Sequence, residues 1–304
     1  MEHPYFSVRI SASADQPTHD REDATHMSNR WNLTKIGAIA LAAMMAVPVA
    51  AEMDPGTEAK LKAALMSPIR SEANKARDAA RHPLETLKFF GVKDTMTVME
   101  IWPSGGWYTE VLAPVLKDKG KFIGAHWDPE AKSEFVVKAI GQYKTMLAAH
   151  PDLSKVEMGM LWPATDKLSP APAGSVDIVL TFRNIHNWMA QDLQDKMLAS
   201  FFQALKPGGY LGVVEHRANT DKPQDPKAVS GYVREDFAIA LAEKTGFKLV
   251  KKSEVNANPK DTKNYPKGVW TLPPTYREGE VDKAKYTAIG ESDRFTLLFQ
   301  KPAS

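Results

Sequence analysis

Several residues that could bind a ligand or perform chemistry follow directly after apolar segments of this sequence. Glu100 lies at the end of the apolar segment 95–101, and Ser104–Gly106 follow it before a helical pattern begins at Trp107. Glycines in such a turn allow backbone N–H groups to approach a ligand at the helix N-terminus, where the helix dipole favours negative charge. The carboxylate of Glu100 could accept a hydrogen bond from an ammonium or hydroxyl group above the turn. The glycine turn alone is weak evidence, because it is equally typical of an ordinary strand–helix connection.

Two acidic residues occupy positions where a nucleotide-like cofactor could be held. Asp128 directly follows the apolar segment 121–127 and lies 22 residues beyond Gly106, a spacing at which an acid can hydrogen-bond a ribose. Alternatively, Asp128 begins the next helix, since Asp is a favoured N-cap and the proline after it a favoured first helical residue. Asp166 precedes the apolar run 176–182, where it could accept a hydrogen bond from the exocyclic amine of a purine.

The segment FRNIHNW (182–188) is rich in polar side chains and follows the same apolar run. Arg183, Asn184 and His186 would be costly to bury without hydrogen-bond partners. We therefore predict that this loop forms part of a site. His186 could act as a general base near neutral pH, although a lone histidine is often only a structural hydrogen-bonding group.

Charged residues also follow the apolar run 210–214, namely Glu215, His216 and Arg217. Together with His186 and Asp128 they could in principle form a His/carboxylate metal set. The sequence has no HxH or HExxH spacing in support of that reading, so we predict no metal.

The elements that position these residues alternate between strand-length apolar runs and helical patterns. The predicted strands are 95–101, 121–127, 156–161, 176–182, 210–216, 247–255 and 294–300. Runs as continuously apolar as 176–182 are typical of a parallel sheet covered by helices on both faces. The segment before the last strand, 256–292, is polar and carries no clear crossover helix, so we predict that the last strand is antiparallel. The fold class is therefore α/β, with a Rossmann-like, mostly parallel, seven-stranded sheet.

Composition limits the function classes. The 304 residues carry a net charge of only +2 and no clustered basic stripe, which argues against nucleic acid as a partner. Cysteine is absent, which excludes disulfides, thiolate nucleophiles and cysteine-ligated metals.

The N-terminal region indicates export. Residues 27–51 combine a short basic stretch, the apolar run 36–47 and small residues before Ala51, as in a secretory signal peptide cleaved after that residue. The apolar run is too short to span a bilayer, so we expect no stable membrane anchor after cleavage and a periplasmic location. Residues 1–26 are acidic and fit no signal peptide, so we interpret them as an upstream extension before a start at Met27. Residues 52–90, a helical pattern divided by prolines, are predicted to form a lid over the domain 91–304.

The order of these motifs resembles that of class I S-adenosylmethionine-dependent methyltransferases. The resemblance rests on E-x-x-x-x-G-G after the first strand, the acid after the second, the AGSVDIVL strand, and ALKPGG (204–209) as the turn before the fifth. Within that superfamily, EIWPSGGWYTEVLAP, LTFRNIHNW, ALKPGGYLGVVEHRA and GYVREDF are similar to a bacterial group of exported predicted methyltransferases. The similarity extends from about Arg81 to Gln300.

The resemblance implies S-adenosylmethionine as cofactor and a role for each matching residue. The turn would face the methionine moiety, Glu100 would hold its amino end, Asp128 the ribose and Asp166 the adenine amine. The turn departs from the family pattern E/D-x-G-x-G-x-G, because Trp102 and Ser104 replace the first two glycines. The implied cofactor-binding residues are Glu100, Trp102, Ser104, Gly105, Gly106, Asp128, Asp166 and Phe182.

The favoured hypothesis is methyl transfer to a small-molecule acceptor in the periplasm. Such a displacement requires mainly positioning and a dry, electrostatically matched pocket. His186 is the candidate base, and Arg183 and Asn184 would orient the acceptor. The alternatives are a non-catalytic protein that binds a nucleoside or another small ligand on the same fold, and an NAD-linked oxidoreductase. The oxidoreductase is disfavoured because the turn lacks G-x-G-x-x-G.

Overall fold

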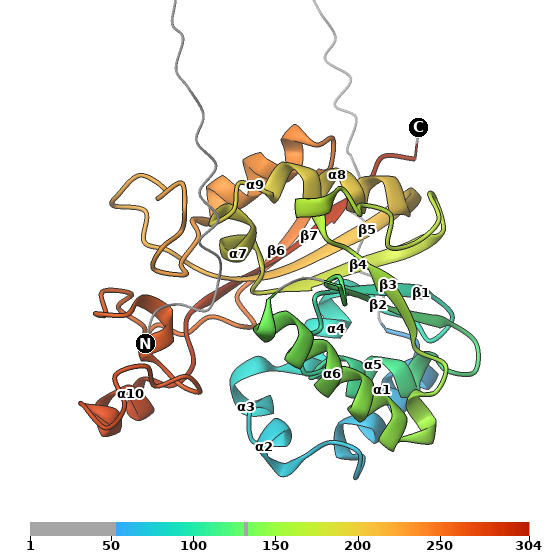
Figure 1. The fold of residues 1–304 in the computed structure, drawn as a ribbon, viewed down its shortest axis with the longest axis horizontal. Helices are drawn as coiled ribbons and strands as arrows, with labels where there is room; N and C mark the ends of the chain where they lie inside the picture. The colour runs from blue at the N-terminus through green and yellow to red at the C-terminus, as the bar shows by residue number, and fades with distance from the viewer. Residues whose placement is uncertain (1–52, 131–132, 304) are drawn as a thin grey trace, which may run out of the picture. The chain divides into compact units, whose positions relative to one another are not determined.

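The structure is a computed structural model that describes residues 53–130 and 133–303 (Figure 1). The predicted upstream extension (1–26) and signal peptide (27–51) lie outside the described residues. Among the helices that are described, none has both the length and the apolar character needed to cross a bilayer.

A seven-stranded sheet forms the centre of the described unit. Its strands are β1 (Thr97–Ile101), β2 (Lys121–His126), β3 (Glu157–Met160), β4 (Val176–Phe182), β5 (Leu205–His216), β6 (Lys248–Ser253) and β7 (Arg294–Gln300). Their order is β3-β2-β1-β4-β5-β7-β6; the pairs among β1 to β5 are parallel, and β7 is antiparallel to both β5 and β6. The Rossmann-like fold and the antiparallel last strand predicted from the sequence are confirmed.

The strand order reverses between β1 and β4, which places a topological switch point at the ends of these two strands. Ligands of open α/β sheets bind beyond the carboxyl ends of the strands at such a point. The residues that follow β1 and β4 are therefore the first candidates for a site.

Helices cover both faces of the sheet (Figure 1). They are α1 (Pro55–Met66), α2 (Glu72–Lys75), α3 (Asp78–Arg81), α4 (Pro83–Phe90), α5 (Thr109–Leu116), α6 (Glu134–Ala149), α7 (Ile185–Met189), α8 (Gln194–Ala204), α9 (Glu235–Lys244) and α10 (Lys283–Ile289), with 3-10 turns η1 (Pro151–Leu153), η2 (Pro163–Thr165) and η3 (Gly268–Thr271). Residues of α1, α4 and α5 share one apolar core with one face of the sheet, and residues of α8 and α9 share a second core with the other face. The continuously apolar β4 contributes to both cores, as Val179 and Leu180 show.

The N-terminal helices and the polar segment 256–292, which are far apart in the sequence, contact each other. The guanidinium groups of Arg77 and Arg81 lie 2.7 and 3.2 Å from carboxylate oxygens of Glu291, and Asn256 Nδ2 donates to Thr86 Oγ1 at 3.0 Å. Because α1 and α4 also belong to the core beneath β1, residues 53–90 are packed onto the sheet domain; the role of 52–90 as a lid stays a prediction.

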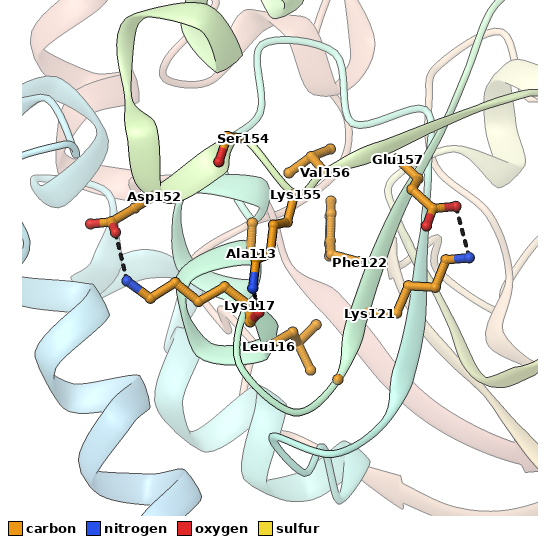
Figure 2. A pocket seen from close by; sticks show the side chains of 11 residues that line it. Ala113, Leu116, Lys117, Lys121, Phe122, Asp152, Ser154, Lys155, Val156 and Glu157 are labelled. Atoms are coloured by element: carbon orange, nitrogen blue, oxygen red, sulfur yellow. Dashed lines mark hydrogen bonds and ion pairs between the residues drawn. The ribbon is translucent and has the colours of Figure 1, made fainter.

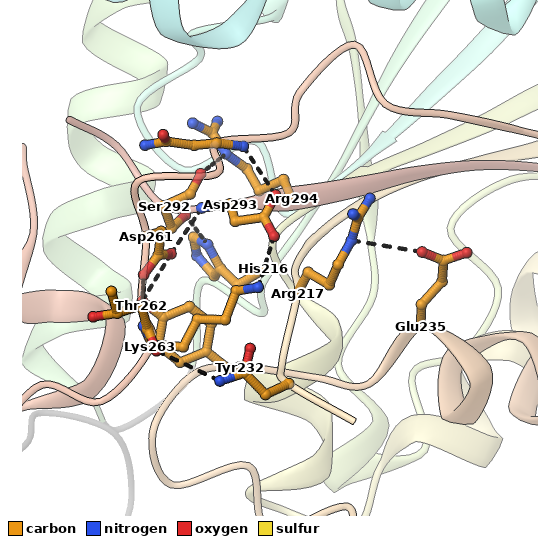
Figure 3. A network of polar contacts seen from close by, with 12 residues as sticks. His216, Arg217, Tyr232, Glu235, Asp261, Thr262, Lys263, Ser292, Asp293 and Arg294 are labelled. Atoms are coloured by element: carbon orange, nitrogen blue, oxygen red, sulfur yellow. Dashed lines mark hydrogen bonds and ion pairs between the residues drawn. The ribbon is translucent and has the colours of Figure 1, made fainter. Parts of the chain in front are cut away.

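A network around Asp261 fastens the same polar segment to the sheet (Figure 3). Tyr232 Oη donates to Asp261, with both carboxylate oxygens at 3.0 Å, and the backbone N–H of Asp293 donates to Asp261 Oδ2 at 2.8 Å. Lys263 forms an ion pair with Asp293 at 2.9 Å. These bonds fix the chain immediately before β7 begins at Arg294.

Two local predictions were wrong. The segment 204–209 is not a turn before β5, because β5 already starts at Leu205, directly after α8 ends. The register of the pairing with β4 shifts between Leu205 and Tyr210, so the residues between these two are an irregularity within the strand. The C-terminal tail extends the ladder there, since the N–H of Gly208 donates to Lys301 O and the N–H of Lys301 donates to Gly209 O. The segment 182–188 is not all loop, because the buried side chains of Ile185, Trp188 and Met189 recur at helical spacing and form α7.

Candidate functional site

The turn after β1 has the backbone shape of a glycine loop although only its last such position is glycine. Trp102, Ser104 and Gly106 have φ values of +47°, +53° and +83°. A residue with a side chain is strained by about 1–2 kcal/mol in this left-handed region. The two substituted positions therefore keep a conformation that glycine would adopt freely, and strain of this kind is concentrated at functional sites.

Gly106 serves helix packing. A Cβ atom there would lie 2.2 Å from Met146 Cε and 3.2 Å from the ring of Tyr143, both on α6. In dinucleotide-binding folds the third glycine of the loop has this close-packing role. Gly105, in contrast, is exposed, and no atom lies within 4 Å of the position that a Cβ would occupy there. The surface at which a ligand could approach the backbone is therefore that of Ser104 and Gly105.

The indole of Trp102 points into the core and leaves that surface open. Its Nε1–H donates to Leu161 O at 3.1 Å, and its ring lies 5.6 Å from that of Trp127 and 6.3 Å from those of Trp162 and Trp188. Trp102 is only 5% exposed. The side chain is therefore a core residue that anchors the turn from below.

Glu100 is enclosed beneath the turn. It is 4% exposed, and its carboxylate accepts a hydrogen bond from Thr109 Oγ1 at 3.0 Å, an atom that also lies 3.1 Å from Tyr143 Oη. Burial raises the pKa of Glu100 to about 8, and the Thr109 hydrogen bond and the charge of Arg183 only partly oppose this. A protonated carboxyl group is therefore the main form near neutral pH.

His126 is a residue of this region that the sequence analysis missed. It ends β2, is fully buried, and its Nε2 lies 3.3 Å from the carbonyl oxygen of Ser104, while its Nδ1 accepts from the N–H of Trp127 at 2.9 Å. Burial lowers the pKa of His126 to about 4, so the ring is neutral with its proton on Nε2. It thereby supports the left-handed backbone at Ser104. Its place as the last residue of a strand beside the switch point was the available signal.

Asp128 and Asp166 are held by lysines. Asp128 accepts from Lys167 Nζ at 2.7 Å and from the N–H of Glu130 at 2.9 Å. The hydrogen bond from Lys167, with smaller contributions, lowers the pKa of Asp128. The alternative that Asp128 caps the next helix is wrong, because α6 starts at Glu134 with Ser133 as its cap. Asp166 is 78% exposed in its side chain and pairs with Lys196 of α8 at 2.9 Å.

Of the predicted residues after β4, His186 has the geometry of an oriented base. Its Nδ1 lies 3.0 Å from Glu215 Oε1, and both side chains are buried. Glu215 also accepts from the N–H groups of Ile185 at 2.6 Å and His216 at 2.8 Å, so the carboxylate is held as an acceptor. This arrangement places the ring proton of His186 on Nδ1 and leaves Nε2 as the basic atom.

The side-chain amide of Asn184 links the ends of two strands. Its Nδ2 donates to Ile101 O at 3.0 Å and lies 3.3 Å from Thr181 Oγ1, which ties the end of β4 to the end of β1. Its amide donors are therefore used within the protein, and a role in orienting an acceptor would fall to its oxygen alone.

His186, Glu215 and His216 could also offer ligand atoms to a metal ion, since one such atom from each lies within 4.8 Å of the others. Asp128 does not join them, because it is bound to Lys167. His216 Nδ1 lies 2.5 Å from Ser292 Oγ, and Glu215 already accepts three hydrogen bonds. The observed contacts are thus those of a hydrogen-bonded His–Glu pair.

Arg183 and Phe182 line a small cavity at the end of β4. The ring of Phe182 stacks on Tyr108 at 3.7 Å and 13°, and Arg183 has a φ of +61°. The cavity has a volume of about 10 Å³, and its other lining residues are Arg81, Tyr108, Val214, Asn256 and Arg294.

A larger cavity of about 490 Å³ lies at the opposite ends of the strands, where β2 and β3 begin (Figure 2). Two of its charged pairs are Lys117 with Asp152 at 2.6 Å and Lys121 with Glu157 at 2.7 Å, and Lys155 donates to the backbone oxygen of Lys117 at 2.8 Å. Because this cavity lies away from the carboxyl ends of the strands, we do not consider it the functional site.

Comparison with known proteins supports the fold. No protein-family model matches the sequence, and no curated protein matches it. The [4+2]-cyclase SpnF has a similar structure, with a TM-score of 0.50 and 12% identity over 83% of this chain and 98% of that one. Similar structures also include a SAM-dependent methyltransferase from Aquifex aeolicus (TM-score 0.49, 19% identity, 80% and 98% covered) and a possible exported protein from Bordetella parapertussis (0.45, 14%, 81% and 79%). At 12% identity the likeness to SpnF shows the Rossmann-like fold alone.

Proposed function

We propose that the protein is an S-adenosylmethionine-dependent methyltransferase that acts on a small molecule. The observation that carries the proposal is the left-handed backbone at Trp102 and Ser104, at the switch point of the sheet. The indole of Trp102 is stabilised by core packing, whereas Ser104 is exposed, so no burial of its side chain offsets the strain there. Binding of a ligand to this turn would account for the left-handed backbone at Ser104.

The residues of the turn fit the cofactor. The open space beside Gly105 is the side on which a ligand can approach the backbone, and the buried Trp102 does not block it. Ser104 and Gly105 would contact the methionine moiety. Glu100 would receive its ammonium group on losing its own proton, and Asp128 would bind the ribose in place of Lys167. When bound, the cofactor supplies the electrophilic methyl group.

The chain itself would position the acceptor and accept a proton. Nε2 of His186 is the basic atom, and Glu215 holds the ring so that this atom is available. Arg183 directly follows β4, the strand that leads into the helix of His186. His186 is needed only if the acceptor must lose a proton for the displacement, so its contribution depends on the acceptor atom.

The variant Gly105→Val tests whether the turn Ser104–Gly106 binds the cofactor. The position has free space and no left-handed φ, so the variant should fold normally while its side chain blocks the approach to the backbone. We expect calorimetry to show cofactor binding to the wild type and at least a tenfold weaker affinity in the variant. Gly141→Ala in α6, which also has open space, is the control and should bind like the wild type. Absence of binding to the wild type at millimolar cofactor would refute the proposal.

The alternative is a non-catalytic protein that would bind a ligand at the same turn but would transfer no methyl group. One structural neighbour is a cyclase, which illustrates that a shared fold does not fix the chemistry. Cofactor binding without methyl transfer to any of a broad panel of small acceptors would favour a binding protein.

We further propose that the protein acts in the periplasm after removal of residues 27–51. Mass spectrometry of the protein recovered from the periplasm should give an N-terminus at Glu52. Recovery only from the cytoplasm with residues 27–51 intact would contradict this.

A further inference from the structure

Three guanidinium groups contact a single carboxylate, that of Glu291, near the His186–Glu215 pair, and the charge of a fourth, Arg183, also acts on it. Arg77, Arg81 and Arg294 lie 2.7, 3.2 and 3.1 Å from oxygens of Glu291. Arg81 and Arg294 are 4% and 3% exposed, so their charges are poorly solvated. Burial acts to raise the pKa of Glu291, but the surrounding arginines lower it to about 2. The carboxylate is thus always ionised near neutral pH, and the cluster still has excess positive charge.

Arg183 forms no close ion pair within the described part of the chain. Its guanidinium has neither a hydrogen bond nor an ion pair with any residue there, although Glu291 lies near enough to raise its pKa and Arg294 near enough to lower it. Burial lowers the pKa of Arg183 to about 10, which still leaves it charged. Its backbone is also held at a φ of +61°. Arg183 is thus a half-buried cation without a direct ion-pair partner on a strained backbone position, which makes it available to an anion from outside the protein.

Asn256 adds an unpartnered acceptor to the same cavity. The residue is 3% exposed, its Nδ2 donates to Thr86 Oγ1 and Thr296 Oγ1, and its Oδ1 has no hydrogen-bond partner. The amide orientation is fixed because the hydroxyl of Thr86 donates to Arg81 O and must accept from Asn256. A ligand in this cavity would therefore meet several cationic donors and one acceptor.

We propose that the cavity lined by Arg81, Arg183, Arg294 and Asn256 binds the oxyanion group of a small molecule, a carboxylate or phosphate with a neighbouring hydrogen-bond donor. Its volume of about 10 Å³ admits little more than one oxygen atom, and the unpartnered Arg183 is the side chain that can move to admit the rest. Guanidinium groups suit such ligands because they bind carboxylate and phosphate through paired hydrogen bonds.

The position of the arginine cluster indicates that the bound oxyanion belongs to the methyl acceptor. This assignment rests on the methyltransferase function proposed above. Arg183 is three residues from His186, and Arg294 pairs in the sheet with His216, which follows Glu215. Burial, and then the charges of His186, Arg183 and Arg294, lower the pKa of His216, which shows how close the cluster lies to the pair. An acceptor held by its anionic end here would present its other end near His186.

Inorganic phosphate is the probe for the site. We would measure thermal unfolding of the full protein across a phosphate series at constant ionic strength and pH 7, and compare Arg183→Asn, Glu291→Gln and Lys244→Gln. Asn tolerates the left-handed backbone at position 183. Lys244 is an exposed cation on α9, so its loss controls for a general charge effect. Phosphate should raise the melting temperature of the wild type and Lys244→Gln alike, and Arg183→Asn should bind phosphate at least tenfold more weakly.

The Glu291→Gln variant gives a result that poor folding cannot imitate. Removing the internal carboxylate leaves all four arginines in need of an anion, so its melting temperature should depend on phosphate more steeply than that of the wild type, with about tenfold tighter binding. No phosphate dependence in the wild type and in Glu291→Gln would overturn the site. If S-adenosylmethionine competes with phosphate, the oxyanion is the cofactor's carboxylate and the assignment to the acceptor is wrong. If the cofactor does not bind, the phosphate series still decides whether the oxyanion site exists.

Discussion

Replacing Glu100 by glutamine should make the folding stability of the protein less sensitive to pH between about 5 and 8. The carboxyl group is buried with Thr109 and Tyr143 as its polar neighbours. Burial raises its pKa from 4.5 to about 8. The glutamine side chain is of the same size and does not titrate, and the hydroxyl of Thr109 can bond to either side chain.

The sign follows from the raised pKa. Between pH 4.5 and 8 the folded protein holds a proton on Glu100 that the unfolded chain has released. The contribution to stability is therefore fully present below about pH 4.5 and is lost as the pH rises through about 8. The loss is about 1.4 kcal/mol per pH unit and approaches ~5 kcal/mol over the whole interval, as an upper bound.

Urea unfolding at pH 5, 6, 7, 8 and 9 measures this directly. The free energy of unfolding of Glu100→Gln minus that of the wild type should rise with pH by up to about 1.4 kcal/mol per unit and become constant above pH 8. Asp94→Asn is the control: the hydrogen bond from Lys60 lowers the pKa of Asp94, so its difference curve should be flat over this range. A flat curve for Glu100→Gln as well would show that the carboxyl group is not buried in its neutral form, and the enclosed geometry beneath the turn would be wrong.

Two further predictions concern the strand ends. Gly106→Ala should lower the free energy of unfolding by about 2–3 kcal/mol, because its Cβ would lie 3.2 Å from the ring of Tyr143 and displace the flexible end of Met146 in addition to the backbone strain. Gly91→Ala, with a φ of +71° but open space, should lose only about 1 kcal/mol. Similar losses for both glycines would contradict the packing role of Gly106. Asn184→Ala should lower the free energy of unfolding by about 1–3 kcal/mol, because the buried carbonyl of Ile101 loses its donor from Asn184; urea unfolding checks this, and an unchanged midpoint would refute the link between β1 and β4.

The sequence predicted the sheet well where its patterns are local. The bounds of β4 and β7 agree with the apolar runs 176–182 and 294–300, because continuous apolarity is the direct consequence of burial on both faces. The direction of β7 followed from the missing crossover helix. Where pairing partners are distant, as between Gly208 and Lys301, the local pattern could not show that the strand extends through a proline–glycine segment.

The site was predicted only in part, for a similar reason. Glu100, Ser104 and Gly105 could be identified because a strand–turn–helix pattern is continuous in sequence. The arginine cluster could not, since Arg81 and Arg294 are more than two hundred residues apart and meet only because β7 inserts beside β5. The bond between Glu215 and His186 likewise depends on the adjacency of β4 and β5.

Two of the strained backbone positions at the switch point, Ser104 and Arg183, indicate how the site is divided. Ser104 follows β1 and Arg183 follows β4, and both have left-handed φ values that glycine would adopt at lower energy. The side chain of Ser104 is exposed, so His126 supports this position only through its carbonyl oxygen, and Arg183 forms no close ion pair in the described chain. If both positions bound the same ligand, a substitution at either one should weaken the binding of every ligand to the same extent. The oxyanion site is cationic, whereas the group beneath the turn is the carboxyl of Glu100, which is neutral near neutral pH and accepts from an ammonium group only after it loses its proton, so the two positions have different ligand requirements. A cofactor on the β1 side and an anionic acceptor on the β4 side satisfy both requirements with Asn184 joining the two strand ends between them.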